Sequence, residues 1–117
     1  MRQQLGGGMR QAGVLAAAGL VALENMIPRL AEDHANARLL GEALARCPGV
    51  RAAPVQTNIV VGVLERRTAA DVAAVLGERD VLASAMDTRT LRLVTHKDVS
   101  TADCGRAAGA LREVLGA

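Results

Sequence analysis

The sequence contains no Phe, Tyr or Trp among its 117 residues. Its core must therefore be built from Leu, Val, Ile, Ala and Met, which bury less area per side chain than aromatic rings do. A chain of this length is long enough for one domain with a modest core and too short for two. We expect residues 1–117 to form a single domain that benefits from a partner surface.

Lysine is nearly absent as well: of the fourteen Lys and Arg residues, only Lys97 is a lysine. The arginines are scattered along the chain, and the formal net charge is only +2. No short segment is predominantly basic, and there are no aromatic rings to stack on bases. We therefore predict no nucleic-acid surface.

The chain has only two cysteines and two histidines, so no metal-site spacing exists. Cys47 and Cys104 are too far apart for a C-x-x-C unit, and we expect both to be reduced and to act as small hydrophobic residues. The uncharged run from Gln11 to Leu23 is shorter than the roughly 20 residues that span a bilayer. No convincing signal-peptide cleavage site follows it. These features predict a cytoplasmic protein with no membrane segment.

Hydrophobic periodicity and turn residues predict four helices and three strands. The helices are expected at 9–25, 28–46, 68–78 and from 100 to the C-terminus, and the strands at 57–63, 81–85 and 90–95. Pro28 separates the first two helices, and Pro48 with Gly49 ends the second. This order predicts an α/β (α+β) fold with packed helices on a small antiparallel sheet.

The expected helices differ in how they should be buried. The first is apolar all round, which is typical of a helix covered on every side. The second has an apolar stripe, and its charged residues lie mostly elsewhere. Two later helices begin with capping-box patterns, each a Ser or Thr followed three residues later by an Asp. The stripe consists of Leu30, Ala37, Leu40 and Leu44, and the charged residues are Arg29, Glu32, Asp33, Arg38 and Glu42.

Two blocks of sequence carry a resemblance to a known family. Residues 5–23 (LGGGMRQAGVLAAAGLVAL) join a triple-glycine turn to a small-residue helix, and residues 91–100 read LRLVTHKDVS. The first block closely resembles the segment that follows the cofactor-bearing lysine in threonine aldolases, which are pyridoxal-phosphate (PLP) enzymes. The second resembles the substrate-carboxylate strand of that family. The resemblance implies the C-terminal small domain of a PLP fold type I enzyme, with a glycine turn and buried interface helix at 1–27 and the small domain at 28–117.

For the complete enzyme, the resemblance implies a homo-oligomeric lyase that cleaves threonine to glycine and acetaldehyde by a retro-aldol reaction with PLP. In this chain, the only lysine lies inside the second block and is not a Schiff-base candidate. We therefore expect the N-terminal cofactor-binding domain to be absent from this chain, and we expect no covalent PLP and no activity from the chain alone. Whether the chain serves an enzyme stays open at this point. The alternative is a non-catalytic remnant or a dimerisation module.

Arg92 is the first candidate site residue. In an extended strand, Leu91 and Leu93 point to one face and Arg92 to the other. The planar guanidinium presents two parallel donors that match a carboxylate. Spacing alone favours an exposed arginine paired with a surface acid, whereas the resemblance implies that Arg92 binds the α-carboxylate of the amino-acid substrate.

Arg10 is the second candidate. A cation near the first turn of a helix opposes the helix dipole unless an anion lies nearby. The resemblance places this segment close to the cofactor, so Arg10 is a candidate ligand of the cofactor phosphate. The alternative is a solvated arginine. Family members often have Arg-Lys before the triple glycine, where this chain has Arg2 and Gln3.

The two histidines are weaker candidates. His96 and Asp98 share a face of an extended segment, so contact is expected. Without a third partner, we interpret His96 as structural or substrate-adjacent. Lys97 is expected to be exposed, and His34 is expected in a core or interface.

Overall fold

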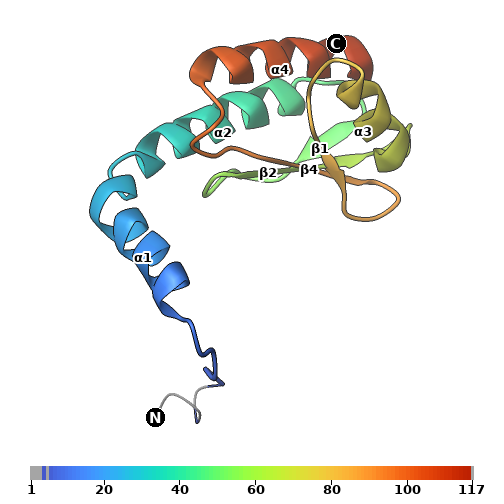
Figure 1. Ribbon diagram of the computed structural model, residues 1–117. Helices are drawn as coiled ribbons and strands as arrows, with labels where there is room; N and C mark the ends of the chain where they lie inside the picture. The colour runs from blue at the N-terminus through green and yellow to red at the C-terminus, as the bar shows by residue number, and fades with distance from the viewer. Residues whose placement is uncertain (1–3, 5, 117) are drawn as a thin grey trace.

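The computed structural model describes residue 4 and residues 6–116, so Arg2 and Gln3 lie outside the described residues. An N-terminal arm (residues 9–27) precedes an α/β body (Figure 1). In the arm, helix α1 (Gly13–Val21) continues into the π-helix η1 (Ala22–Met26). The chain then bends by 77° into α2 (Leu30–Ala45), directly after Pro28. The predicted break between the first two helices is confirmed.

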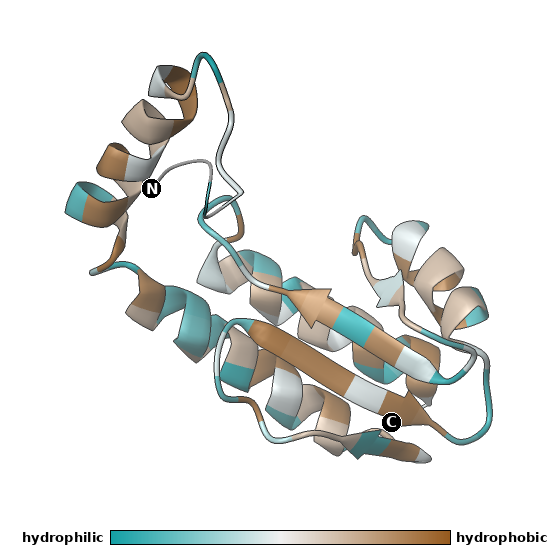
Figure 2. Cartoon of the chain, turned by 90° about the horizontal axis from the view of Figure 1, so that it is seen from below, coloured by the Kyte–Doolittle hydropathy of each residue, from teal (hydrophilic) through white to brown (hydrophobic). Residues whose placement is uncertain are grey.

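The body is a sheet with helices against one face. The strands are antiparallel in the order β1-β2-β4-β3, and Figure 2 views the face that the helices leave open. This arrangement confirms the predicted α/β fold with a small antiparallel sheet. The elements are β1 (Val50–Ala52), β2 (Ile59–Leu64), α3 (Ala69–Gly77), β3 (Ser84–Ala85), β4 (Thr90–Val94) and α4 (Thr101–Leu115).

The core lies between the sheet and helices α2, α3 and α4. Val60 of β2 and Leu91 of β4 point inward, where they join Leu44 of α2. A Cβ placed on Gly62 would lie 2.6 Å from the Cδ2 atom of Leu44. Glycine is therefore required at this position for α2 to approach β2 closely.

The first helix forms as predicted, but it is not buried. No residue of α1 or η1 is buried, and Val14, Leu20 and Leu23 are 77%, 58% and 66% exposed. The reason is that the arm points away from the body, which therefore does not cover it (Figure 1). Within the described part of the chain, no single helix is long and apolar enough to cross a bilayer. Only α1–η1 and α2 taken together reach that length and composition.

Three further expectations need correction. Leu30, which was expected in the apolar stripe of α2, is 45% exposed, because the first turn of α2 extends beyond the sheet. Asp33, which was expected outside that stripe, is buried. The predicted strand at 81–85 is reduced to Ser84–Ala85, because it follows a turn in which Asp80 has a φ of 58°. Strand β1 was not predicted, since it is three residues long and contains the exposed Arg51.

The capping box at the start of α4 is confirmed. The backbone N–H of Asp103 donates to the Ser100 hydroxyl at 3.2 Å, and a carboxylate oxygen of Asp103 accepts from the backbone N–H of Ser100 at 2.9 Å. At α3, Thr68 accepts from the N–H of Asp71 at 3.1 Å, without the reciprocal bond. The hydrogen bond from the Ser100 side chain, followed by that from its backbone, lowers the pKa of Asp103.

We expect Ser100→Ala to destabilise the protein more at neutral pH than in acid. The pKa of Asp103 is lowered in the folded state, so the stability that its carboxylate contributes is present above the ordinary value of 3.8 and is lost as the pH falls through the lowered value. Urea denaturation across a pH series measures this difference, and Ser100→Thr, which keeps the hydroxyl, is the control. A difference between Ser100→Ala and wild type that stays constant with pH would contradict the assignment.

Candidate functional site

Arg92 lies in β4, between β2 and β3, and its side chain points to the face without helices. Its neighbours across the ladder are Val61 and Ser84. Residues paired in this way share a face of the sheet, and Leu91 and Leu93 point to the opposite, buried face. The predicted alternation along this strand is confirmed.

The open face is mainly apolar around Arg92. Ile59 and Val94 are 44% and 42% exposed, and Val61 is half-buried. Figure 2 shows that most residues of β2 are hydrophobic. The polar exceptions beside Arg92 are Ser84 and Thr90. The charge of Arg92 thus stands in a surface of low polarity, where an electrostatic contact is stronger than in water.

Arg92 has no acidic partner within the part of the chain that the structure describes. No carboxylate oxygen there lies within 4.0 Å of its guanidinium. Its Nε atom is buried and has no hydrogen-bond partner. The alternative predicted from spacing, an arginine paired with a surface acid, is therefore not found. A partly buried donor without an acceptor is unfavourable, so an arriving anion would gain a charge-assisted hydrogen bond.

Arg10 is exposed and lies in the turn before α1, in the N-terminal arm. The structure therefore does not bring Arg10 and Arg92 together within one chain. Among the described residues, Arg10 forms no ion pair.

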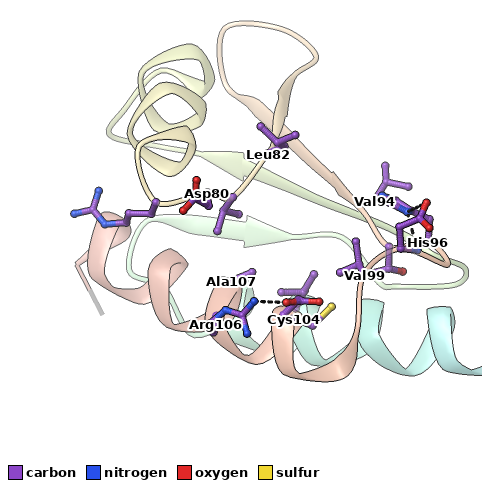
Figure 3. A pocket seen from close by; sticks show the side chains of 14 residues that line it. Asp80, Leu82, Val94, His96, Val99, Cys104, Arg106 and Ala107 are labelled. Carbon is purple, nitrogen blue, oxygen red and sulfur yellow. Dashed lines mark hydrogen bonds and ion pairs between the residues drawn. The ribbon is translucent and has the colours of Figure 1, made fainter.

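A groove of about 630 Å³ lies beside β4, between the segment after α3 and the start of α4 (Figure 3). Arg92 does not line it. His96 does, and its Nδ1 accepts from the backbone N–H of Asp98 at 3.3 Å. The carboxylate of Asp98 pairs with Lys97, and Arg106 on the groove's rim pairs with Asp103. The expected contact between positions 96 and 98 forms, with His96 Nδ1 also 3.7 Å from the Asp98 carboxylate, and both side chains are exposed.

A buried polar cluster was missed at the level of sequence. Asp33, Asn36 and Thr95 are 4%, 1% and 0% exposed. The Thr95 hydroxyl donates to the backbone carbonyl of Asp33 at 2.7 Å, and Arg29 donates to the Asp33 carboxylate at 3.1 Å. The bond from Thr95, three residues beyond Arg92, fixes the end of β4 to the first turns of α2, whereas the bond from Arg29 is local to the start of α2. The sequence pattern that could have indicated this cluster is the spacing of Asp33 and Asn36. These polar residues are three positions apart, on the same face of α2 as Ala37 and Leu40.

The residues of the chain do not fit a resident PLP. The Lys97 side chain is 56% exposed and pairs with Asp98, so it is not placed in any enclosed site. The described residues contain no group of three or more His, Cys, Asp or Glu that could hold a metal ion. Cys47 and Cys104 are buried free thiols, and burial raises the pKa of each.

The family model described as beta-eliminating lyase matches residues 1–67, which is more than half of the chain. The chain belongs to the beta-eliminating lyase family. Among curated relatives, it is 41% identical over 108 residues to low-specificity L-threonine aldolase 1 of Arabidopsis thaliana, covering 88% of this chain and 30% of that protein. It is 40% identical over 114 residues to low specificity L-threonine aldolase of Escherichia coli K12, covering 97% of this chain and 33% of that protein.

This member of the beta-eliminating lyase family thus spans about a third of the length of the relatives it matches. Among solved structures, the cysteine desulfurase CsdA of Escherichia coli has a TM-score of 0.75 at 20% identity, over 94% of this chain and 32% of that one. A transaminase variant has a TM-score of 0.73 at 18% identity, over 98% of this chain and 30% of that one. These likenesses establish the fold, an α/β arrangement that forms part of PLP fold type I enzymes. The predicted resemblance to the C-terminal part of a threonine aldolase is confirmed.

Proposed function

We propose that this chain is the C-terminal part of a PLP-dependent L-threonine aldolase, in which Arg92 binds the α-carboxylate of the amino-acid substrate. The observation that carries the proposal is the unpaired, half-buried guanidinium on the open face of the sheet. The identity of about 40% to low-specificity L-threonine aldolases supports the same assignment.

In this proposal Arg92 has a positioning role, which its orientation on the open face supports. A guanidinium donates two parallel hydrogen bonds to a carboxylate, which fixes both the place and the rotation of the bound amino acid. The apolar side chains of Val61 and Val94 limit the access of water to that ion pair, which strengthens it. In the complete enzyme, bound PLP supplies the electron sink for cleavage of the carbon–carbon bond. This chain does not build that cofactor site by itself.

Three further assignments belong to the same proposal. Arg10 contributes a contact to the cofactor phosphate, which its exposure and its position beside the glycine turn support. The complete enzyme is a homo-oligomer, which the exposed apolar arm supports. Its location is cytoplasmic, in keeping with the two free cysteines.

The second candidate function is an interaction module without catalysis. The exposed arm favours it, because eight large hydrophobic side chains between positions 9 and 30 are left in solvent. They are Met9, Val14, Leu15, Leu20, Val21, Leu23, Ile27 and Leu30.

We expect the isolated chain to produce no glycine or acetaldehyde from threonine above a blank of PLP alone, because it offers no enclosed lysine. The matched test is an exchange protein, in which this chain replaces the third of the E. coli relative that it matches. The exchange protein should cleave threonine when PLP is present. Turnover by the isolated chain would contradict the first expectation. A folded exchange protein that binds PLP but leaves threonine intact would contradict the proposed function and favour the interaction module.

A further inference from the structure

Arg92 lies at the point where β4 loses one of its two neighbouring strands. The β3 residue opposite Arg92 is Ser84, and β3 provides no further pair toward the end of β4 among the described residues. Beyond Arg92, the groove of about 630 Å³ separates β4 from residues 81–82 (Figure 3). Strand β2 alone continues the pairing, as far as Val94. The strand that carries Arg92 therefore has a neighbouring strand on one side only in its last residues.

Thr95 directly follows β4 and is held through both its backbone and its hydroxyl. Its backbone N–H donates to the carbonyl of Asn58 at 2.9 Å, and its own carbonyl accepts from the Asn58 side-chain amide at 2.8 Å. The Thr95 hydroxyl donates to the backbone carbonyl of Asp33 in α2 at 2.7 Å. Because Thr95 is 0% exposed, water does not compete for these bonds. They attach the end of β4 to β2 and to α2 where the pairing with β3 is missing.

We propose that the Thr95 hydroxyl is a positioning group for Arg92. Leu91, Leu93 and Thr95 are buried on the helix side of the strand, so the hydroxyl sets the distance between the end of β4 and α2. That distance places the guanidinium on the opposite, open face. A carboxylate that accepts two parallel hydrogen bonds requires precise placement, and a misplacement of about 1 Å at such a site can cost about 100-fold in rate. Thr95 acts through the backbone and does not touch the substrate.

This inference rests on the proposed function, the binding of the substrate carboxylate by Arg92. It adds a residue on the opposite face of the sheet that determines how well Arg92 performs this role. A residue that contributed to stability alone would affect substrates with and without a carboxylate in the same way. The preference for threonine over threoninamide, which lacks the carboxylate, therefore distinguishes positioning from stability.

The first test removes the hydroxyl in the exchange protein, with PLP present. Thr95→Val keeps the branched shape but loses the donor, so kcat/KM for threonine should fall about five- to tenfold, mainly through a higher KM. For threoninamide, kcat/KM should change less than about twofold, because no carboxylate is bound. Thr95→Ser keeps the hydroxyl and should stay within about twofold of the parent for both substrates.

Val72→Ala is the control for lost stability. Val72 lies in α3, is 0% exposed, and its side chain forms no hydrogen bond with the end of β4. Its truncation should lower the urea midpoint of the exchange protein, because it leaves a cavity in the same core. The preference for threonine over threoninamide should stay unchanged. A change in preference equal to that of Thr95→Val would overturn the inference.

The second test combines Thr95→Val with Arg92→Lys. Lysine lacks the two-pronged donor that requires alignment, so the added Thr95→Val should lower kcat/KM for threonine less than about twofold further. Asn58→Ala removes the donor to the Thr95 carbonyl and should shift the preference in the same direction as Thr95→Val. It takes the place of Thr95→Val if that variant does not fold.

The outcomes separate this inference from the proposed function. If Arg92→Lys leaves the preference for the carboxylate unchanged, the carboxylate role is wrong and the inference is overturned with it. If Arg92→Lys removes the preference while Thr95→Val and Asn58→Ala leave it intact, only the inference is overturned. Equal losses for threonine and threoninamide in Thr95→Val, or full additivity with Arg92→Lys, would also overturn it and assign Thr95 to stability alone.

Discussion

Replacing Arg92 by lysine in the exchange protein is expected to lower kcat/KM for threonine about 10- to 100-fold. A hydrogen bond to a charged group contributes about 1.5–3 kcal/mol, and lysine supplies a point charge in place of the two-pronged donor. The loss should appear mainly as a higher KM, because the carboxylate contact exists before and during the reaction. Steady-state kinetics with increasing threonine concentrations measure it.

Arg51→Lys is the control for this variant. Arg51 belongs to β1, stands opposite Val63 on the open face and is exposed, so it tests the loss of a guanidinium from the same surface. We expect less than about a twofold change in kcat/KM for it. Threoninamide, which lacks the carboxylate, should be a poor substrate that the Arg92→Lys variant handles no worse than the parent. If Arg92→Lys impairs both substrates equally, or if Arg51→Lys matches its effect, the carboxylate role is wrong.

The side on which Arg92 lies could be predicted from sequence, because alternation along a strand depends only on the period of two between Leu91 and Leu93. The caps at Thr68 and Ser100 could also be predicted, since a capping hydroxyl acts within three residues. In both cases the interaction is local. The absence of an acid beside Arg92 could not be predicted, because one of its neighbours across the ladder, Val61, comes from β2, which is separated from β4 by α3.

The exposure of the arm within this chain and the burial of Asp33 could not be predicted for a related reason, and burial of the arm at an interface stays a prediction. An apolar composition indicates that burial of a helix is favourable, but it does not identify the surface that buries it. For α1, the body of this chain does not provide that surface. Asp33 forms a local ion pair with Arg29, one turn earlier, while its Oδ1 atom is buried without a hydrogen-bond partner. The Thr95 hydroxyl donates to the backbone carbonyl of Asp33 from the end of the sheet, and this contact is a tertiary property that periodicity within one helix does not contain.

The largest expected effect on stability comes from Leu44→Ala. Leu44 is fully buried at the centre of the cluster between α2 and β2, and a core without aromatic rings has few large side chains to fill a void. Truncation of a buried leucine costs about 2–5 kcal/mol in unfolding free energy, a large part of the stability of a typical domain. Urea denaturation should detect it. Leu82→Ala is the control, since Leu82 is 90% exposed and its loss should cost less than about 0.5 kcal/mol.

The contact between Leu44 and Gly62 makes a sharper form of this prediction possible. In the wild-type chain, Gly62→Ala should be destabilising, because the new Cβ would lie 2.6 Å from Leu44 Cδ2. In the Leu44→Ala background that atom is gone, and the added methyl group partly fills the cavity. The double variant should therefore lose less stability than the two single losses added together, by about 1 kcal/mol or more. Strict additivity would mean that the two positions do not share a packing contact, and the close approach of α2 to β2 would then be wrong.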